Sequence, residues 1–242
     1  MRDNYTLARL HHDGPLTGEI TLGPKSAHYL GRVIRKGEGD RVRLFNGRDG
    51  EVAAEIVSVA KKSLSLRVTE RLRVPYAPPP VTLMFAPLKR HRTATLLEKA
   101  TELGVTTLQP VITARTQHPK MNLARMQSQI VEAAEQTERL DLPDIHEPVA
   151  LLDAVSHARE PILMGDEAGH APTLLDALGS MRPPLALLVG PEGGWSPDER
   201  ESLHALDHLQ PVTLGPRILR ADTAAISMLT LVQAAVGDWR AS

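Results

Sequence analysis

The chain has 242 residues and a formal net charge of −1. This length is enough for one large domain or two modest ones, since a domain takes roughly 100–200 residues. Hydrophobic residues make up 42% and charged residues 24%, which excludes the disordered class of proteins. The absence of cysteine excludes disulfides, cysteine-ligated metal centres and a thiol nucleophile. No apolar run reaches the roughly 18 residues of a membrane span, and the first residues lack the features of a signal peptide, so we expect a cytoplasmic protein with no membrane partner.

Residues 1–73 are predicted to form a small, mostly β domain. Strands are expected at Tyr5–Leu10, Arg41–Asn46, Glu51–Val59 and Ser63–Val74, with a short helix from Pro24 toward Arg35. This part carries 14 Lys and Arg against 9 Asp and Glu, whereas residues 74–242 carry 14 against 20. A basic surplus in one domain is typical of a surface that meets a polyanion, although chance clustering explains it equally well.

Residues 74–80 are predicted to be a linker, because four of the seven are prolines and lack the backbone donor that a helix or a central strand needs. From residue 81 to 242, predicted strands and helices alternate. The strands are expected at 81–86, 105–112, 161–164, 185–189 and 212–214, and the helices at 90–103, 122–139, 151–157, 173–178, from 197 onward, and at 223–236. This alternation predicts an α/β domain with a largely parallel sheet, in which ligands bind at the carboxyl ends of the strands.

Two glycine-proline loops, each after a predicted strand, are the best candidates for a ligand site. The first, Gly190–Gly194, runs into a helix with Ser196 as its N-cap, and it matches neither the P-loop nor the dinucleotide-binding motif. The second, Leu214–Thr223, carries Arg217 and Arg220 one helical turn apart, so both guanidiniums can point to one side and bind phosphate or carbonyl groups. Tight turns without a ligand, and arginines paired with nearby acids, are the alternative explanations.

Two further groups of residues are weaker candidates. The basic residues Lys89–Arg92 begin a predicted helix, where positive charge opposes the macrodipole and so indicates a nearby anion, although a solvated surface is the commoner explanation. His204 and His208 are four residues apart on a predicted helix, the spacing of a metal-binding pair. No third ligand and no H-E-x-x-H motif accompanies them, so we expect no metal.

Four segments resemble those of a known family. They are Glu98–Val105 (EKATELGV), Ala133–Pro143 (AAEQTERLDLP), Gly190–Glu199 (GPEGGWSPDE) and Leu214–Ala224 (LGPRILRADTA). They are similar to the bacterial 16S ribosomal RNA uridine-N3 methyltransferases, the RsmE family of the SPOUT class, and Ala27–Gly47 is similar to the PUA-like RNA-binding domain of that family.

The resemblance implies the fold and the partners. The expected fold is α/β, with a SPOUT-type, trefoil-knotted parallel sheet in residues 81–242 and a PUA-like β-barrel in residues 1–73. S-adenosyl-L-methionine is the implied cofactor, and 16S ribosomal RNA or the small ribosomal subunit is the implied substrate, so the protein would take part in rRNA processing during ribosome biogenesis. The resemblance also implies a homodimer.

The resemblance further implies site residues. The cofactor would be held by Leu163, Met164, Gly165, Val189, Gly190, Gly194, Leu214, Gly215, Ile218 and Leu219. We expect Arg220 to stabilise the negative charge that develops on the uracil, Arg217 to position a phosphate or the base, and Glu192, or with less support Asp222, to accept the N3 proton. Asp222 is itself a departure, because the family usually has glutamate there.

The RNA backbone is expected to bind to basic residues of the first domain. These are Arg9, Arg32, Arg35, Lys36, Arg41 and Arg43. Two other functions stay open at this point: methylation of a ribose 2′-hydroxyl, as in related SPOUT enzymes, and a non-catalytic RNA-binding assembly factor.

Overall fold

The computed structural model describes residues 6–118, 120–166, 171–179 and 181–240. The chain divides into two compact units. Unit 1 comprises Met1–Ala77 and Ala134–Leu142, and unit 2 comprises Pro78–Ala133 and Pro143–Ser242. The chain therefore returns to unit 1 after leaving it, a feature that the expected division into 1–73, 74–80 and 81–242 does not include.

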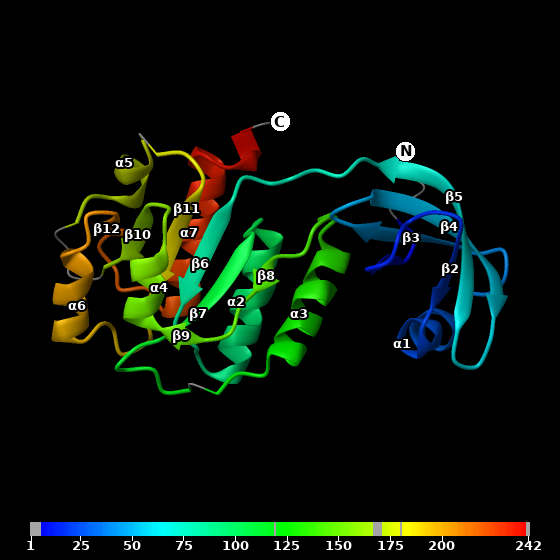
Figure 1. Cartoon of the computed structure of the whole chain (residues 1–242), viewed down its shortest axis with the longest axis horizontal. Helices are drawn as coiled ribbons and strands as arrows, with labels where there is room; N and C mark the ends of the chain where they lie inside the picture. Colours follow the sequence, from blue (N-terminus) through cyan, green and yellow to red (C-terminus); the bar gives the residue numbers. More distant parts are fainter. Residues whose placement is uncertain (1–5, 119, 167–170, 180, 241–242) are drawn as a thin grey trace. The chain divides into compact units, whose positions relative to one another are not determined.

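Unit 1 is built on a five-stranded sheet with the strand order β1-β3-β4-β5-β2. Its elements are β1 (Arg9–His11), β2 (Glu19–Leu22), α1 (Pro24–His28), the π-helix η2 (Tyr29–Val33), β3 (Arg41–Asn46), β4 (Gly50–Val59) and β5 (Leu64–Arg73). β1 pairs with β3 in parallel, and the other pairs are antiparallel. Register shifts between β4 and β5 bend these strands, and the sheet curls into part of a barrel (Figure 1).

The apolar face of this sheet forms the core of unit 1. Leu64 and Leu66 of β5 are buried, and they lie on the same face as Leu44 of β3 and Ile56 of β4. The predicted strands β3, β4 and β5 and the helix beginning at Pro24 are confirmed. β2 was not predicted, because its four residues are too few for their alternation to stand out. The predicted first strand begins at Tyr5, which lies outside the described residues, and the observed β1 covers Arg9–His11.

Unit 2 is built on a sheet with the strand order β12-β10-β11-β6-β7-β8, and β9 pairs with the end of β7. The strands are β6 (Val81–Phe85), β7 (Thr107–Ile112), β8 (Asp144–Ile145), β9 (Val149–Ala150), β10 (Ile162–Gly165), β11 (Leu185–Val189) and β12 (Leu209–Val212). All of their pairings are parallel, which confirms the predicted α/β class. β12 begins and ends earlier than the predicted 212–214; its Pro211 is tolerated because β12 lies at the edge of the sheet.

The helices of unit 2 lie on both sides of the sheet (Figure 1). They are α2 (Arg90–Glu102), α4 (Leu151–His157), α5 (Leu174–Leu178), α6 (Pro197–His204), α7 (Ala221–Ala235) and the 3-10 turn η3 (Asp238–Arg240); α3 (Leu123–Gln136) ends in the segment assigned to unit 1. α2 packs against α7, and α4 packs against α6. After the edge strand β12 the chain returns as α7, which contacts β11.

This topology brings three strand ends together. β10 lies between β11 and β12, and all three are parallel, so the loops that follow them leave from the same edge of the sheet. The helices within the described ranges include none that is long and apolar enough to cross a membrane.

Candidate active site

A cavity of about 470 Å³ lies at the carboxyl ends of β10, β11 and β12. Its size falls within the roughly 300–1,000 Å³ typical of small-molecule sites. The lining residues come from three chain segments: Gly165 and Asp166; Val189–Glu192, Gly194 and Trp195; and Val212–Ala221 with Ala224. The cavity therefore lies at the edge where the sequence predicts ligand binding.

The loop after β11 is shaped by its glycines and by Trp195. A Cβ on Gly190 would lie 2.9 Å from Cζ2 of Trp195, so only glycine lets the indole pack against the backbone here. The indole Nε1–H donates a hydrogen bond of 3.3 Å to the carbonyl oxygen of Gly165, which ties this loop to the end of β10. Gly194 adopts a φ of +67°, a conformation that favours glycine.

The same loop is held at its other end by α6 and by the chain after β7. Ser196 and Glu199 form a capping box, in which each side chain accepts a hydrogen bond from the backbone N–H of the other residue. The Glu199 carboxylate also accepts from the N–H of Ala114, at 2.6 Å. The Arg115 guanidinium donates to the carbonyl oxygen of Gly193, at 2.7 Å. The predicted capped helix is thus confirmed, and the loop is anchored to two neighbouring segments.

The loop after β12 supplies the second wall. Gly215 has a φ of +107°, which lets the chain turn there. Arg217 and Arg220 both line the cavity and are exposed, and neither has an ion-pair partner among the residues that the structure describes. Arg220 is the N-cap of α7. Two unneutralised guanidiniums on one wall are suited to binding phosphate or a developing negative charge.

The carboxylate of Asp166, which follows β10, is bound by two side chains of α6. Asp166 is buried, and its Oδ1 accepts a hydrogen bond of 2.5 Å from Nη1 of Arg200, while Nε2 of His204 lies 3.3 Å from its Oδ2. His208 instead contacts the carbonyl oxygen of Val155 through its Nε2, at 2.9 Å. The two histidines therefore have separate partners, and no group of three His, Asp or Glu side chains in the described ranges is arranged to hold a metal.

Arg92 joins the two cavity loops, a role that the sequence alone did not reveal. Its Nη1 lies 3.0 Å from both carboxylate oxygens of Asp222, and its Nε lies 3.4 Å from Oε1 of Glu192. The signal was the run of basic residues at the start of α2, which indicated a nearby anion. Two such anions lie there, Glu192 in the loop after β11 and Asp222 in the first turn of α7.

Most of the residues expected to hold the cofactor line the cavity. These are Gly165, Val189, Gly190, Gly194, Leu214, Gly215, Ile218 and Leu219, together with the expected catalytic residues Glu192, Arg217 and Arg220. Leu163 and Met164 do not line it, because they lie inside β10, where both side chains are buried in the sheet. The resemblance marked the correct strand, but its residues contribute to the core before the chain reaches the cavity.

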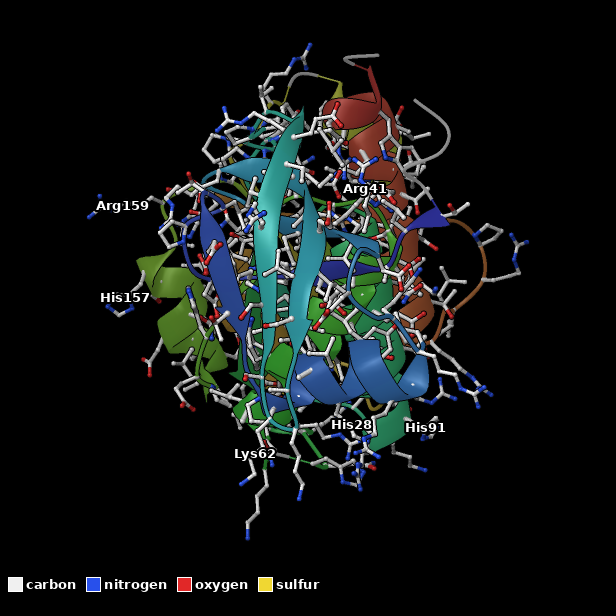
Figure 2. The ribbon with its side chains drawn as sticks, turned by 90° about the vertical axis from the view of Figure 1, so that its right-hand side faces the viewer. His28, Arg41, Lys62, His91, His157 and Arg159 are labelled. Carbon is white, nitrogen blue, oxygen red and sulfur yellow. The ribbon has the colours of Figure 1, made fainter. Side chains whose placement is uncertain are left out.

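The residues expected to bind RNA fall into two groups. Arg32, Arg35 and Arg41 are exposed and Lys36 is partly exposed. Other basic side chains of unit 1 project into solvent; Figure 2 shows this for His28 on α1 and for Lys62 in the β4–β5 turn. Arg9 and Arg43 differ, because both are buried. They are therefore not accessible to a phosphate backbone, and we leave them out of the RNA surface.

Arg9 and Arg43 belong to a buried ion cluster of unit 1. Arg9 Nε lies 2.6 Å from Oε1 of Glu51, and Arg43 makes two contacts of 2.7 and 2.6 Å with the carboxylate of Glu138. Arg73 contacts both carboxylates, at 2.7 and 3.0 Å. Burial lowers the pKa of Arg9, and its hydrogen bond to Glu51 opposes the shift. Burial raises the pKa of Glu138, but hydrogen bonding to Arg43 and the charges of the three arginines outweigh it and lower that pKa.

Comparison with known proteins defines the class of protein. The sequence matches the family described as "RNA methyltransferase domain" over residues 75–233 and the family described as "RNA methyltransferase PUA domain" over residues 22–69. The parallel sheet with its cavity and the curled β unit are thus those of an RNA methyltransferase with a PUA domain, which confirms the expected fold class.

Individual relatives narrow the class. The chain is 35% identical to the ribosomal RNA small subunit methyltransferase E of Rickettsia conorii, over 85% of each chain, and 36% identical to that of Synechocystis sp., over 89% of this chain and 73% of the other. A Legionella pneumophila protein solved in complex with the bound cofactor SAM matches with a TM-score of 0.88 and 34% identity, covering 96% of this chain and 99% of the other. The chain belongs to the ribosomal RNA small subunit methyltransferase E family.

A second solved structure supports the same assignment. It is the ribosomal RNA small subunit methyltransferase E of Neisseria gonorrhoeae bound to S-adenosyl methionine, with a TM-score of 0.82 and 26% identity over 96% of this chain and 99% of the other.

Proposed function

We propose that this protein transfers a methyl group from S-adenosylmethionine to N3 of a uridine in the 16S RNA of the small ribosomal subunit. The observation that carries the proposal is the cavity at the ends of β10, β11 and β12, with Glu192 on one wall and Arg217 and Arg220 on the other. Membership of the family and the cofactor-bound relatives from Legionella and Neisseria support it.

The residues of the cavity fit the proposed cofactor. Glycines at 165, 190, 194 and 215 bring backbone amides and carbonyls to the cavity surface, where they can read the polar edge of an adenine. Val189, Leu214 and Leu219 add apolar lining for its faces. When bound, S-adenosylmethionine supplies a methyl group on a positively charged sulfur.

The chain's own residues would then act on the uracil. N3 of uracil is a weak nucleophile until its proton leaves, so a proton acceptor near N3 is needed. Glu192, which lines the cavity, would take that proton. Loss of the proton spreads negative charge to O2 and O4, and Arg220 would stabilise that charge. Arg217, three residues earlier, would position the base or an adjacent phosphate.

The RNA surface is proposed on unit 1. It comprises Arg32, Arg35, Lys36 and Arg41, whose accessible positive charges suit a phosphate backbone. We retain 1–73 as the PUA-like RNA-binding domain, 74–80 as the linker and 81–242 as the methyltransferase domain within this proposal. A ribosomal substrate also favours the cytoplasm as the location.

A homodimer is part of the proposal. Ile218 lies on the cavity wall with 77% of its surface exposed, and a second subunit would cover it. Sedimentation analysis of the parent and of Ile218→Asp checks this, with a dimer expected for the parent and a shift toward monomer for the variant. A monomeric parent would contradict it.

Calorimetric titration with S-adenosylmethionine tests the cofactor site. The parent is expected to bind, while Gly194→Trp and Ala224→Phe, which both fill the cavity, are expected to lose binding. Ala224 lies on helix α7, so its variant avoids the backbone strain that a side chain at Gly194 would meet. Leu152→Trp, an exposed position on α4, is the matched control and should bind as the parent does. A parent that binds no cofactor with or without 16S RNA would favour a non-catalytic assembly factor.

A further inference from the structure

We propose that Arg92 is a positioning residue of the methyl-transfer site, which it organises by binding Glu192 and Asp222 at the same time. The inference rests on the proposed function, because it concerns the same cavity. It adds a residue of α2, outside both cavity loops, to the parts that set their geometry.

The two carboxylates come from different segments of the chain. Glu192 lies in the loop that follows β11, and Asp222 lies in the first turn of α7. Arg92 lies in the first turn of α2, which packs against α7. One guanidinium therefore joins the loop after β11 and the first turn of α7 to the start of α2. A shift of that loop or of the first turn of α7 would break its link to Arg92.

The two contacts differ in strength. Both carboxylate oxygens of Asp222 accept hydrogen bonds of 3.0 Å from Nη1 of Arg92, whereas Oε1 of Glu192 lies 3.4 Å from Nε of Arg92. Asp222 is thus the main partner of Arg92, and the interaction of Arg92 with Glu192 is the weaker one. The weaker interaction positions Glu192 but leaves its carboxylate available to accept a proton.

Partial burial sets these ion pairs apart from ordinary surface pairs. The side chain of Arg92 is 18% exposed, that of Asp222 16% and that of Glu192 33%. Partly buried charges are screened less by salt than exposed ones. Arg92 is one cation that contacts two carboxylates. Without it, the negative charges of Glu192 and Asp222 would repel each other and push the loop after β11 away from the start of α7.

The chemistry of arginine suits this role better than that of lysine. Nε and the Nη groups of a guanidinium form a rigid planar fork, which can face two carboxylates at once. A lysine ammonium is one flexible point charge. We therefore expect Arg92→Lys to preserve the net charge but to hold only one of the two loops.

The first test compares Arg92→Ala with Arg90→Ala. Arg90 lies in the same helical turn, is exposed and has no ion-pair partner in the described part of the chain, so it is a matched control. Misplacement of a proton acceptor by about 1 Å costs on the order of 10²-fold in rate. We expect Arg92→Ala to lower kcat by about that factor, with a much smaller change in the KM for RNA, and Arg90→Ala to behave as the parent. Arg92→Lys should recover part of the lost kcat.

The second test needs no catalysis. Hydrogen exchange of the backbone amides in residues 190–195 and 221–224 should be faster in Arg92→Ala than in the parent, and unchanged in Arg90→Ala. Combining Arg92→Ala with Asp222→Ala should add little further effect, because either change removes the same ion pair. Exchange at the parental rate in Arg92→Ala, or fully additive effects in the double variant, would overturn the proposal.

These outcomes separate the inference from the proposed function. A parent that neither binds S-adenosylmethionine nor methylates RNA would defeat the proposed function, while the exchange measurement would still test the link between the loops. If Arg92→Ala lowers the melting temperature strongly, Arg92→Lys takes its place. A parental kcat and parental hydrogen-exchange rates in Arg92→Lys would then contradict the claim that the planar guanidinium must contact both carboxylates.

Discussion

Arg43 of β3 and Glu138 form a two-contact ion pair across 95 residues of sequence, with Nη1–Oε2 and Nη2–Oε1 distances of 2.7 and 2.6 Å. The pair fixes the returning segment Ala134–Leu142 to the sheet of unit 1. Arg9 strengthens the same connection by donating to the carbonyl oxygens of Ala134 and Arg139. Two of the basic residues that the sequence indicated as an RNA surface, Arg9 and Arg43, therefore hold unit 1 together instead.

Glu51→Gln is expected to destabilise unit 1 strongly. The Glu51 side chain is 2% exposed and contacts Arg9, Arg43 and Arg73, so its loss leaves three guanidiniums with the single carboxylate of Glu138. Removing one partner of a buried ion pair costs about 3–5 kcal/mol. Urea unfolding of the parent and the variant at neutral pH measures the difference in free energy.

Glu55→Gln is the control for this experiment, because Glu55 lies on the same strand β4 and is exposed. Its effect should stay within about 0.5 kcal/mol, as for most surface substitutions. Equal stability of the two variants would show that the cluster contributes nothing beyond a surface charge.

The stability of unit 1 should fall in acid. The pKa of Glu138 in the folded protein is lowered from its ordinary value of 4.5, so the unfolded chain binds a proton first as the pH falls. The stabilisation from the ionised carboxylate is present above about pH 4.5 and is lost as the pH falls through the lower folded value. Glu138→Gln should show a smaller loss as the pH falls below about 4.5, measured by urea unfolding at each pH. The same pH dependence in both proteins would argue against this ion pair as its source.

Arg220→Ala should lower the rate of methylation at saturating RNA by about 10²–10³-fold, the usual loss when one donor to a developing negative charge is removed. Cofactor binding should change little, and Arg220→Lys should recover only part of the rate because it lacks the planar fork. Single-turnover kinetics with 16S RNA measures the chemical step. Arg159→Ala is the control, since Arg159 projects away from unit 2 into solvent (Figure 2). A full rate in Arg220→Ala would remove Arg220 from the mechanism.

RNA affinity should depend on salt and on the exposed basic residues of unit 1. Alanine at Arg32 or Arg35 should weaken binding and reduce the slope of log K against log salt by about 1 for each phosphate group that is no longer neutralised. Filter binding or fluorescence anisotropy over a range of salt concentrations gives both quantities. Arg67→Ala is the comparison, because Arg67 is already paired with Glu19 at 3.2 Å. An affinity that is insensitive to salt would contradict a phosphate-binding surface.

Much of the unit 2 architecture could be predicted from the sequence, because β6, β10 and β11 are short apolar runs that each follow a proline. β11 and α4 were predicted with their observed boundaries, and Ser196 caps α6 as expected. β8 and β9 were not predicted, since two-residue strands have no periodicity to detect. The position of β12 was shifted because Pro211 suppresses the strand pattern in an edge strand that tolerates it.

The site was predictable where chemistry follows local sequence, and not where it depends on distant residues. The glycine loops and the pair Arg217 and Arg220 stand out by spacing alone, and they lie on one cavity. The burial of Arg9 and Arg43 depends on Glu138, far along the chain, so composition suggested a basic surface instead. The partners of Arg92 were hidden for the same reason, with only an unfavourable run of charge at the start of α2 as a sign.

The identity of the methylated atom tests the central claim most directly. The purified protein is incubated with S-adenosylmethionine carrying a deuterated methyl group and with small ribosomal subunits or their 16S RNA, both lacking the modification, and the RNA is digested to nucleosides for mass analysis. Label in 3-methyluridine is the predicted result, and it should disappear with Gly194→Trp. Label in a ribose-methylated nucleoside, or no label from a protein that binds both cofactor and RNA, would contradict the account.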